Sequence, residues 1–179
     1  MTAIYAVHTA KALEVIVWLA NAKPRIDIYH VIKCAFFADK FHLREYGRPI
    51  AGDNYIADTY GPLGLTVYRL LKGNPLELLA LGGNGMLPFR VSKPGWTVEA
   101  DREANVRVLS KSDVEALGEA LSAYGDLSFD ELMDITHDDP AYRAANGGRM
   151  KYEHFLDYDD PEYEMMAEDL SESSRYAVM

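Results

Sequence analysis

The sequence contains a single cysteine, Cys34, among 179 residues. One thiol per chain excludes an internal disulfide framework and a zinc cage built from several cysteines. Long hydrophobic runs are also lacking, since the apolar stretch from Ala12 to Ala20 is interrupted by Glu14 and no basic residue precedes Lys11. Such a stretch is too short to span a bilayer and lacks the basic start of a secretory signal. We therefore expect a cytoplasmic protein that does not contact a membrane.

Basic residues are in deficit, with 18 Lys and Arg against 28 Asp and Glu and a formal net charge of −10. Because affinity for phosphate backbones depends on clustered Lys and Arg, nucleic acid is not expected as a partner. Residues 1–93 carry 11 basic and 7 acidic side chains, whereas residues 94–179 carry 7 and 21. Between Asp126 and Glu172 lie 15 acidic and 3 basic residues. This acidic segment forms either a face for a basic partner or a solvated surface without a partner.

Recognisable catalytic and metal-binding motifs are absent as well. The sequence has neither a G-x-S-x-G nucleophile elbow nor an H-E-x-x-H metal motif. Its five histidines, at positions 8, 30, 42, 137 and 154, include no pair at i,i+4 spacing. We therefore predict no bound metal and no cofactor.

Apolar residues recur at helical spacing along most of the chain. Together with stop signals, this spacing predicts helices over about 7–22, 28–46 and 62–72, one turn at 76–81, a helix from the 110–113 capping box to 124, and helices over about 128–136 and 140–146. Asp27 and Gly47 are typical residues for the two ends of the second helix, and Pro62 is expected at the first position of the third.

The β signals are few. Residues 89–92 and 96–100 alternate in polarity around Lys93-Pro94-Gly95, which is typical of a hairpin, and residues 55–57 indicate a short extended segment. The expected fold class is mainly α, a compact helical domain with a small antiparallel β-hairpin or sheet element. We expect one domain over residues 1–148, followed by an acidic, Tyr- and Met-rich extension over 149–179 that is partly helical.

The helix predicted over 28–46 carries the main candidate site. A helical wheel places Asp39, His42 and Tyr46 on one inward face, with Lys33, Lys40 and Arg44 on an opposite, solvated basic stripe. Buried polar groups need partners, so we predict a structural polar network that fixes this helix to the following loop. Its predicted members are Asp39, His42, Tyr46, Arg48 and Asp53. The alternative is an acid/base pair of Asp39 and His42 in a small hydrolase-like enzyme.

A resemblance to a known family rests on two blocks of the sequence. The first comprises F-F-A-D-K-F-H-L-R-E-Y-G-R-P-I-A-G-D (36–53), Y-I-A (55–57), Y-G-P (60–62) and V-Y-R-L-L-K-G (67–73). The second comprises L-S (109–110) with Asp113, Y-G-D-L-S (124–128), Leu132 and T-H-D-D-P-A-Y (136–142). Together these blocks, spanning about residues 10–145, closely resemble the Panacea domain, the SocA-like antitoxin family that is also met as a phage-associated protein. Phe37 departs from the tyrosine common in that family, and Leu63 from the usual valine.

The resemblance implies a mainly helical antitoxin domain, assigned here to residues 1–148, that neutralises a cognate protein toxin by direct binding. It further implies a toxin encoded next to the antitoxin, a role as a proteolytic adaptor that delivers the toxin to a cytosolic AAA+ protease, and no enzymatic activity. Tight neutralisation requires a desolvated apolar centre as well as charge. The residues predicted to contact the partner are Tyr55, Tyr60, Tyr163, Met166, Asp159, Asp160 and Glu162.

Overall fold

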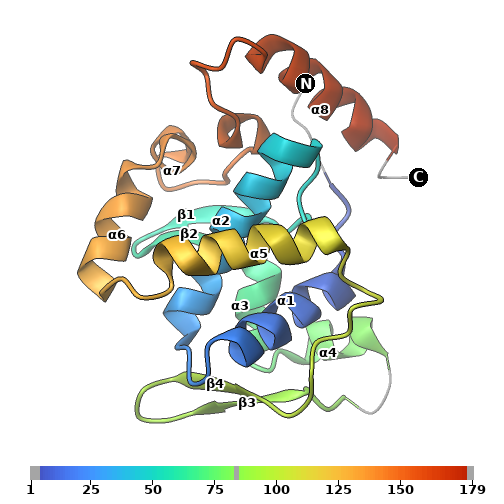
Figure 1. Cartoon of the computed structure of the whole chain (residues 1–179), viewed down its shortest axis with the longest axis vertical. Helices are drawn as coiled ribbons and strands as arrows, with labels where there is room; N and C mark the ends of the chain where they lie inside the picture. The colour runs from blue at the N-terminus through green and yellow to red at the C-terminus, as the bar shows by residue number, and fades with distance from the viewer. Residues whose placement is uncertain (1–4, 83–84, 177–179) are drawn as a thin grey trace.

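A computed structural model describes residues 5–82 and 85–176 of the chain, and within them the fold is mainly α (Figure 1). This confirms the expected fold class, since the described residues form eight α-helices and two separate two-stranded antiparallel sheets. The helices are α1 (Thr9–Ala22), α2 (Ile28–Tyr46), α3 (Leu65–Leu71), α4 (Pro75–Leu81), α5 (Lys111–Tyr124), α6 (Phe129–Asp138), α7 (Pro140–Ala145) and α8 (Tyr163–Tyr176). The strands are β1 (Tyr55–Asp58), β2 (Gly61–Gly64), β3 (Phe89–Ser92) and β4 (Thr97–Ala100), and a 3₁₀ turn covers Tyr152–Phe155.

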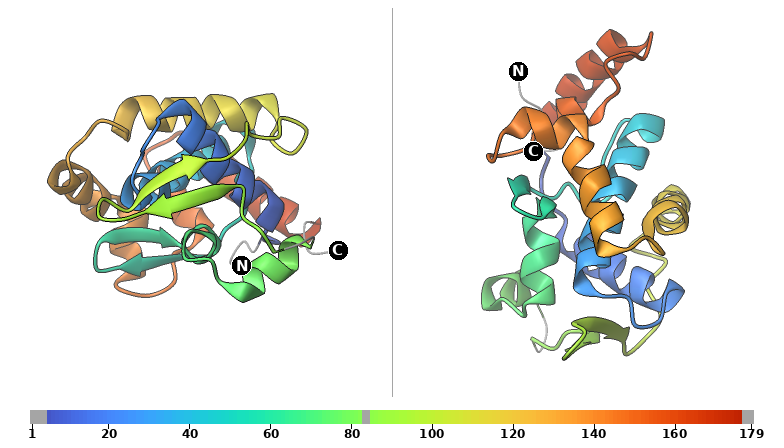
Figure 2. Two further views of the ribbon diagram at one scale, coloured as in Figure 1. Left: turned by 90° about the horizontal axis from the view of Figure 1, so that it is seen from below. Right: turned by 90° about the vertical axis from the view of Figure 1, so that its left-hand side faces the viewer.

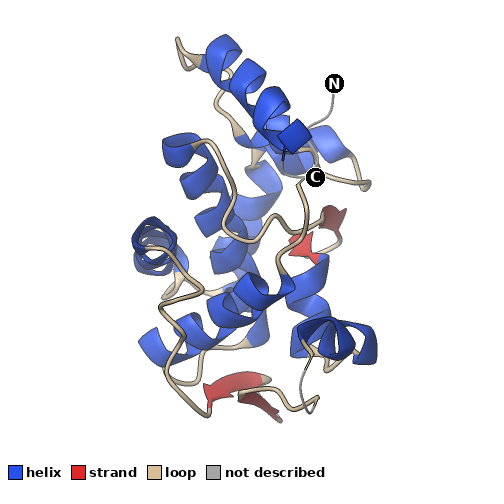
Figure 3. Cartoon of the chain, turned by 90° about the vertical axis from the view of Figure 1, so that its right-hand side faces the viewer, coloured by secondary structure: helices blue, strands red, loops and turns tan. Residues whose placement is uncertain are grey.

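Helix α2 runs through the centre of the molecule, and α1, α3, α5, α6 and the β1–β2 hairpin pack against it (Figures 1 and 3). The Asp27 carboxylate caps its N-terminus by accepting from the His30 N–H at 2.9 Å, and Gly47 ends it in the left-handed conformation at φ 69°. Both end residues are as the sequence predicts, because caps are local signals. Phe36 and Leu43, fully enclosed, anchor α2 in the core.

The predicted basic stripe on α2 is wrong. Lys33 and Lys40 are buried, and Arg44 is half-buried with its Nε donating to the Phe155 carbonyl at 2.9 Å. The face assigned to solvent is covered by the β1–β2 hairpin and by the segment that contains α6 and α7. Each buried amine has a partner: Lys33 Nζ donates to the Pro62 carbonyl at 2.8 Å, and Lys40 forms an ion pair with Asp139.

The β3–β4 hairpin is antiparallel as predicted, whereas the short extended segment expected at 55–57 is one strand of a second hairpin, β1–β2, and one helix boundary differs from the prediction. Pro62 lies on β2, paired with Ala57, and α3 begins only at Leu65. The buried Asp53 carboxylate accepts from the Thr66 and Val67 N–H groups at 2.9 and 3.0 Å. A distant side chain therefore caps α3, and the boundary could not be located from the residues next to it.

The capping boxes predicted at Ser110–Asp113 and Ser128–Glu131 are both present, at the starts of α5 and α6. After Gly148 the chain packs back onto the core rather than leaving it. The buried residues in this segment are Met150, Tyr152, Phe155, Leu156 and Leu170. Helix α8, which the sequence predicts from its apolar spacing, lies at the end of the molecule opposite the β3–β4 hairpin (Figures 1 and 2). No helix among the described residues is both long and apolar enough to cross a membrane.

Candidate functional site

Asp39 is buried in α2, and its carboxylate accepts three hydrogen bonds. The Ile50 and Ala51 N–H groups donate to Oδ1 at 2.8 and 3.3 Å, and the Tyr55 hydroxyl donates to Oδ2 at 2.9 Å. Burial raises the pKa of Asp39 to about 7, in opposition to these bonds. The carboxylate therefore joins the loop after α2, and the start of β1, to the helix.

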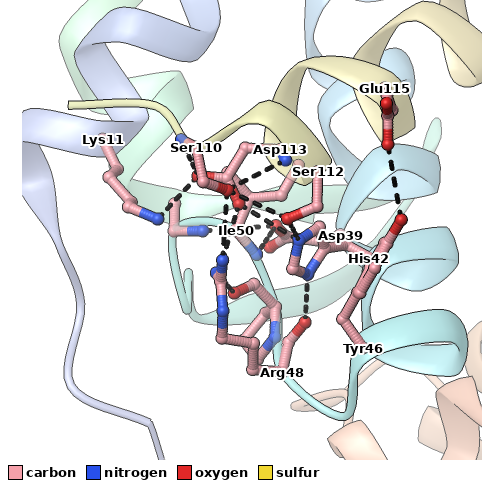
Figure 4. A network of polar contacts seen from close by, with 12 residues as sticks. Lys11, Asp39, His42, Tyr46, Arg48, Ile50, Ser110, Ser112, Asp113 and Glu115 are labelled. Atoms are coloured by element: carbon pink, nitrogen blue, oxygen red, sulfur yellow. Dashed lines mark hydrogen bonds and ion pairs between the residues drawn. The ribbon is translucent and has the colours of Figure 1, made fainter. Parts of the chain in front are cut away.

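His42 lies one turn further along α2 and has no solvent-exposed surface. Its Nδ1 lies 2.7 Å from the Arg48 carbonyl oxygen, and its Nε2 lies 3.0 Å from Ser112 Oγ on α5 (Figure 4). Because a carbonyl can only accept, Nδ1 carries the proton that is donated to Arg48. Burial lowers the pKa of His42, which favours the neutral ring. The imidazole thus connects α2, the following loop and α5.

Asp113 is the centre of this network, although the sequence indicated it only as a helix cap. Its side chain is fully buried at the start of α5, 2.7 Å from Lys11 Nζ, 3.1 Å from Arg48 Nη2 and 3.2 Å from His42 Nε2 (Figure 4). Burial raises the pKa of Asp113, but hydrogen bonds from Lys11 and the Ser110 N–H outweigh it and hold the pKa below its ordinary value. One carboxylate therefore links α1, α5 and the loop after α2.

The pair of Asp39 and His42 that the alternative enzyme hypothesis requires does not form, because the two side chains bond to separate sets of groups. Asp53 instead accepts hydrogen bonds from N–H groups at the start of α3. Tyr46 is also misassigned: it is 48% exposed rather than inward, with its ring centroid 4.7 Å from that of His42. It covers the imidazole from the outside, at the end of α2. The enclosed His42, without an open face toward a substrate, is more consistent with a structural role than with acid/base chemistry.

A hollow of about 540 Å³ lies beside this network, lined by the chain before α1 and the loop after α2. Lys11 and Arg48 reach its wall, but both cations are paired with Asp113. Among residues 5–82 and 85–176, no group of three His, Cys, Asp or Glu side chains lies close enough to hold a metal ion.

The residues predicted to contact a partner fall into three environments. Tyr55 is buried, with its hydroxyl on Asp39, so its assignment to a binding surface is wrong. Tyr60, by contrast, is 57% exposed in the turn between β1 and β2. The predicted contact residues of the extension divide into the half-buried Tyr163 and Met166, which pack against the core, and the exposed Asp159, Asp160 and Glu162.

Phe129 is an exposed aromatic residue that is absent from the predicted contact residues. Phe129 begins α6, is 44% exposed, and its ring centroid lies 6.0 Å from that of Tyr60. Its position directly after the Ser128 helix cap, in an acidic segment, was the feature of the sequence that could have indicated its exposure. Its neighbour in space, Tyr60, is 69 positions away in the chain, so only the folded structure brings the two together.

A comparison with protein families matches residues 31–142 to the family described as antitoxin SocA-like, Panacea domain. No curated protein and no solved structure matches the chain. The matched segment begins in α2 and ends in α7, and it includes Asp39, His42, Asp53 and most of the Asp113 network. Since this segment covers more than half of the 179 residues, the chain belongs to the SocA-like antitoxin family that is defined by the Panacea domain.

Proposed function

We propose that this protein is the antitoxin of a toxin–antitoxin pair and neutralises a cognate protein toxin by binding it directly. The observation that carries the proposal is the family match over residues 31–142. The polar side chains inside this segment hold its elements together, as Asp39 does for the loop after α2. The surface, rather than an enclosed pocket, is then the part that acts.

The surface has the charge that such a role needs. Exposed acidic side chains cover much of α6 and α8, and a toxin that acts on RNA, nucleotides or the replication machinery often has a basic working surface. Complementary potentials accelerate the encounter of two proteins and suppress association with partners of the wrong charge. We propose a cytoplasmic complex with a toxin that is encoded by the neighbouring reading frame.

Expression of the neighbouring reading frame from one plasmid and of this chain from a second plasmid tests the proposal. We expect the first alone to stop growth and the second to restore it, with both proteins recovered as one complex. Failure of this chain to restore growth, or restoration without a complex, would contradict neutralisation by binding.

A role as an adaptor for a cytosolic AAA+ protease is a separate part of the proposal. It predicts that the toxin disappears faster after translation is stopped when the antitoxin is present, and that deletion of the protease abolishes this difference. An unchanged toxin half-life would leave neutralisation in place and remove the adaptor role.

A further inference from the structure

Two exposed aromatic rings lie together where the β1–β2 turn meets α6. Tyr60 and Phe129 are 57% and 44% exposed, and their ring centroids are 6.0 Å apart. The Phe129 ring also packs on Tyr29, at 4.5 Å between centroids. Neighbouring exposed aromatic residues are typical of the energetic centre of a protein interface, where Tyr and Trp are enriched and large rings bury much area.

The two rings rest on a well-supported base. The Thr59–Tyr60 turn is closed by the pairing of Asp58 with Gly61, and Gly61 adopts φ 94°. A Cβ at Gly61 would lie 2.5 Å from Thr136 Oγ1, so the turn lies directly against α6. The Tyr142 hydroxyl donates to the Asp58 carbonyl at 2.8 Å and attaches the hairpin to α7. A surface that is ordered before binding loses less conformational entropy when a partner arrives.

Acidic side chains follow Phe129 along the same helix. Asp130, Asp134 and Asp138 follow one another at i,i+4 spacing and therefore lie along one side of α6. All three are exposed, and none forms an ion pair within the described part of the chain. Helix α6 contains no Lys or Arg. The right panel of Figure 2 shows the hairpin and α6 side by side on this edge of the molecule.

We propose that this aromatic–acidic face, comprising Tyr60, Phe129, Asp130 and Asp134, is the surface that docks the toxin, through a patch of Lys and Arg around an apolar contact. The inference rests on the proposed antitoxin function and adds to it the site and the chemistry of the partner. Cations placed over the Tyr60 and Phe129 rings would gain cation–π attraction in addition to the ion pairs with the aspartates.

The other exposed apolar surfaces fit a basic partner less well. Leu76 and Leu79 of α4 are more than 70% exposed, but they lie near Lys72 and Arg69, and they offer no aromatic ring. At the C-terminal end, Tyr158 and Met165 are 50% and 55% exposed beside acidic residues, but this surface lies outside residues 31–142, the segment that matches the antitoxin family. Among these three surfaces, only the aromatic–acidic face combines exposed rings with exposed acid inside the segment that matches the antitoxin family.

Binding between the purified full chain and the protein encoded by the neighbouring reading frame tests the face, with growth rescue as a second readout. We expect the double variant Tyr60→Ser/Phe129→Ser to weaken the complex by about 100-fold or more, since each central aromatic residue of an interface contributes roughly 2 kcal/mol, a factor of about 30. The matched control, Leu76→Ser/Leu79→Ser, removes a similar apolar area on α4, and we expect it to change the affinity less than about threefold.

The acidic part of the face has its own test. We expect Asp130→Asn/Asp134→Asn to lower the association rate by about tenfold at low salt and to reduce the dependence of that rate on ionic strength. Glu164→Gln/Glu168→Gln on α8 removes the same charge elsewhere and serves as the control. Equal effects of the two pairs would show that only net charge matters, and would overturn the acidic half of the proposal.

The outcomes separate the face from the function. If the natural chain itself neither binds nor rescues, the proposed antitoxin function fails. If it binds and rescues while a folded Tyr60→Ser/Phe129→Ser variant does so equally well, the docking face is wrong. If the natural chain alone is a dimer that this variant converts to a monomer, the face is a self-association surface instead. Should the double variant melt early, Tyr60→Ser alone, in an exposed turn, decides by the same affinity criterion.

Discussion

The charged residues around Asp113 and those of α6 and α8 are chemically alike, yet they occupy opposite situations. Asp113 is fully buried and forms ion pairs with Lys11 and Arg48, whereas the aspartates of α6 are exposed and unpaired within the described residues. A buried charge with partners joins elements, and its removal leaves other charges uncompensated. An exposed charge contributes little to stability and is available to another molecule. The comparison predicts that stability and toxin binding can be changed separately.

The largest effect is expected at the centre of the buried network. Asp113→Ala removes the partner of Lys11 and Arg48 and half of the α5 capping box, so we expect the free energy of unfolding to fall by roughly 2–3 kcal/mol, because both cations keep some access to solvent. Urea denaturation measures it. Glu115→Ala, at a half-exposed position on the same helix, is the control and should cost less than about 0.5 kcal/mol. Similar losses in both variants would remove the distinction between buried and exposed charge.

Removal of α8 is expected to have the next largest effect, and on stability alone. Deletion of residues 163–179 removes the buried Leu170 side chain from the core, so the free energy of unfolding should fall by roughly 2 kcal/mol. The aromatic–acidic face remains intact. Leu170→Ala in the full chain should reproduce most of that loss without removing any acid. We expect growth rescue to persist in both variants. If the truncated chain folds but no longer rescues growth, the binding surface lies on α8 instead.

The buried amine of Lys33 should make stability depend on pH. Burial lowers its pKa from 10.5 to about 7, so between these values the unfolded chain holds a proton that the folded chain lacks. Stability attributable to this position therefore rises with pH, by at most about 1.4 kcal/mol per unit. The free energy of unfolding of the natural chain minus that of Lys33→Met, measured at pH 7, 8 and 9, should therefore increase with pH. A constant difference would show that the amine stays charged in the fold.

Asp39 should produce the opposite slope at lower pH. Its pKa is raised from 3.8 to about 7, so the folded chain holds the extra proton and stability falls as pH rises through that window. Asp39→Asn keeps the shape of the side chain and removes the titration. The same measurement at pH 5, 6 and 7 should therefore show the natural chain losing stability relative to the variant. A parallel pair of curves would argue that the three hydrogen bonds keep the carboxylate ionised throughout.

The smallest effect is expected from the exposed acid of α8. Glu164→Gln/Glu168→Gln should change the free energy of unfolding by less than about 0.5 kcal/mol, since neither side chain forms an ion pair with a described residue. Rescue of growth should be unchanged. Loss of rescue with unaltered stability would show that the docking surface extends beyond α6 to the exposed acid of α8.

The elements that local chemistry specifies were predictable. The caps of α2, α5 and α6 depend on residues within a few positions of each helix end, and the β3–β4 hairpin depends on alternation around a short turn. The start of α3 was not predictable in this way, because its cap is Asp53, more than ten positions before the helix. Pro62 is compatible both with the first position of a helix, as predicted, and with the short strand β2 in which it lies.

Burial was predicted less accurately than secondary structure. A helical wheel assumes that one face of the helix is exposed to solvent, but α2 is enclosed by elements on several sides. Lys33 and Lys40 are therefore buried, and each has a polar partner. The same enclosure buries Tyr55 and gives Asp39 and His42 different hydrogen-bond partners. Asp113 was visible only as a cap, because Lys11 and Arg48 approach it from parts of the chain that are 102 and 65 residues away.

The sequence by itself determined the helical class, most helix ends, the family resemblance and the concentration of acid after Asp126, since each depends on composition or on residues close in the chain. Only the tertiary structure decided which of those charges are paired and which are free, because pairing depends on long-range packing. It also decided that Tyr60 and Phe129 meet on one surface next to the exposed aspartates of α6. That juxtaposition requires a hairpin turn and a helix start to meet, and no local pattern encodes such a contact.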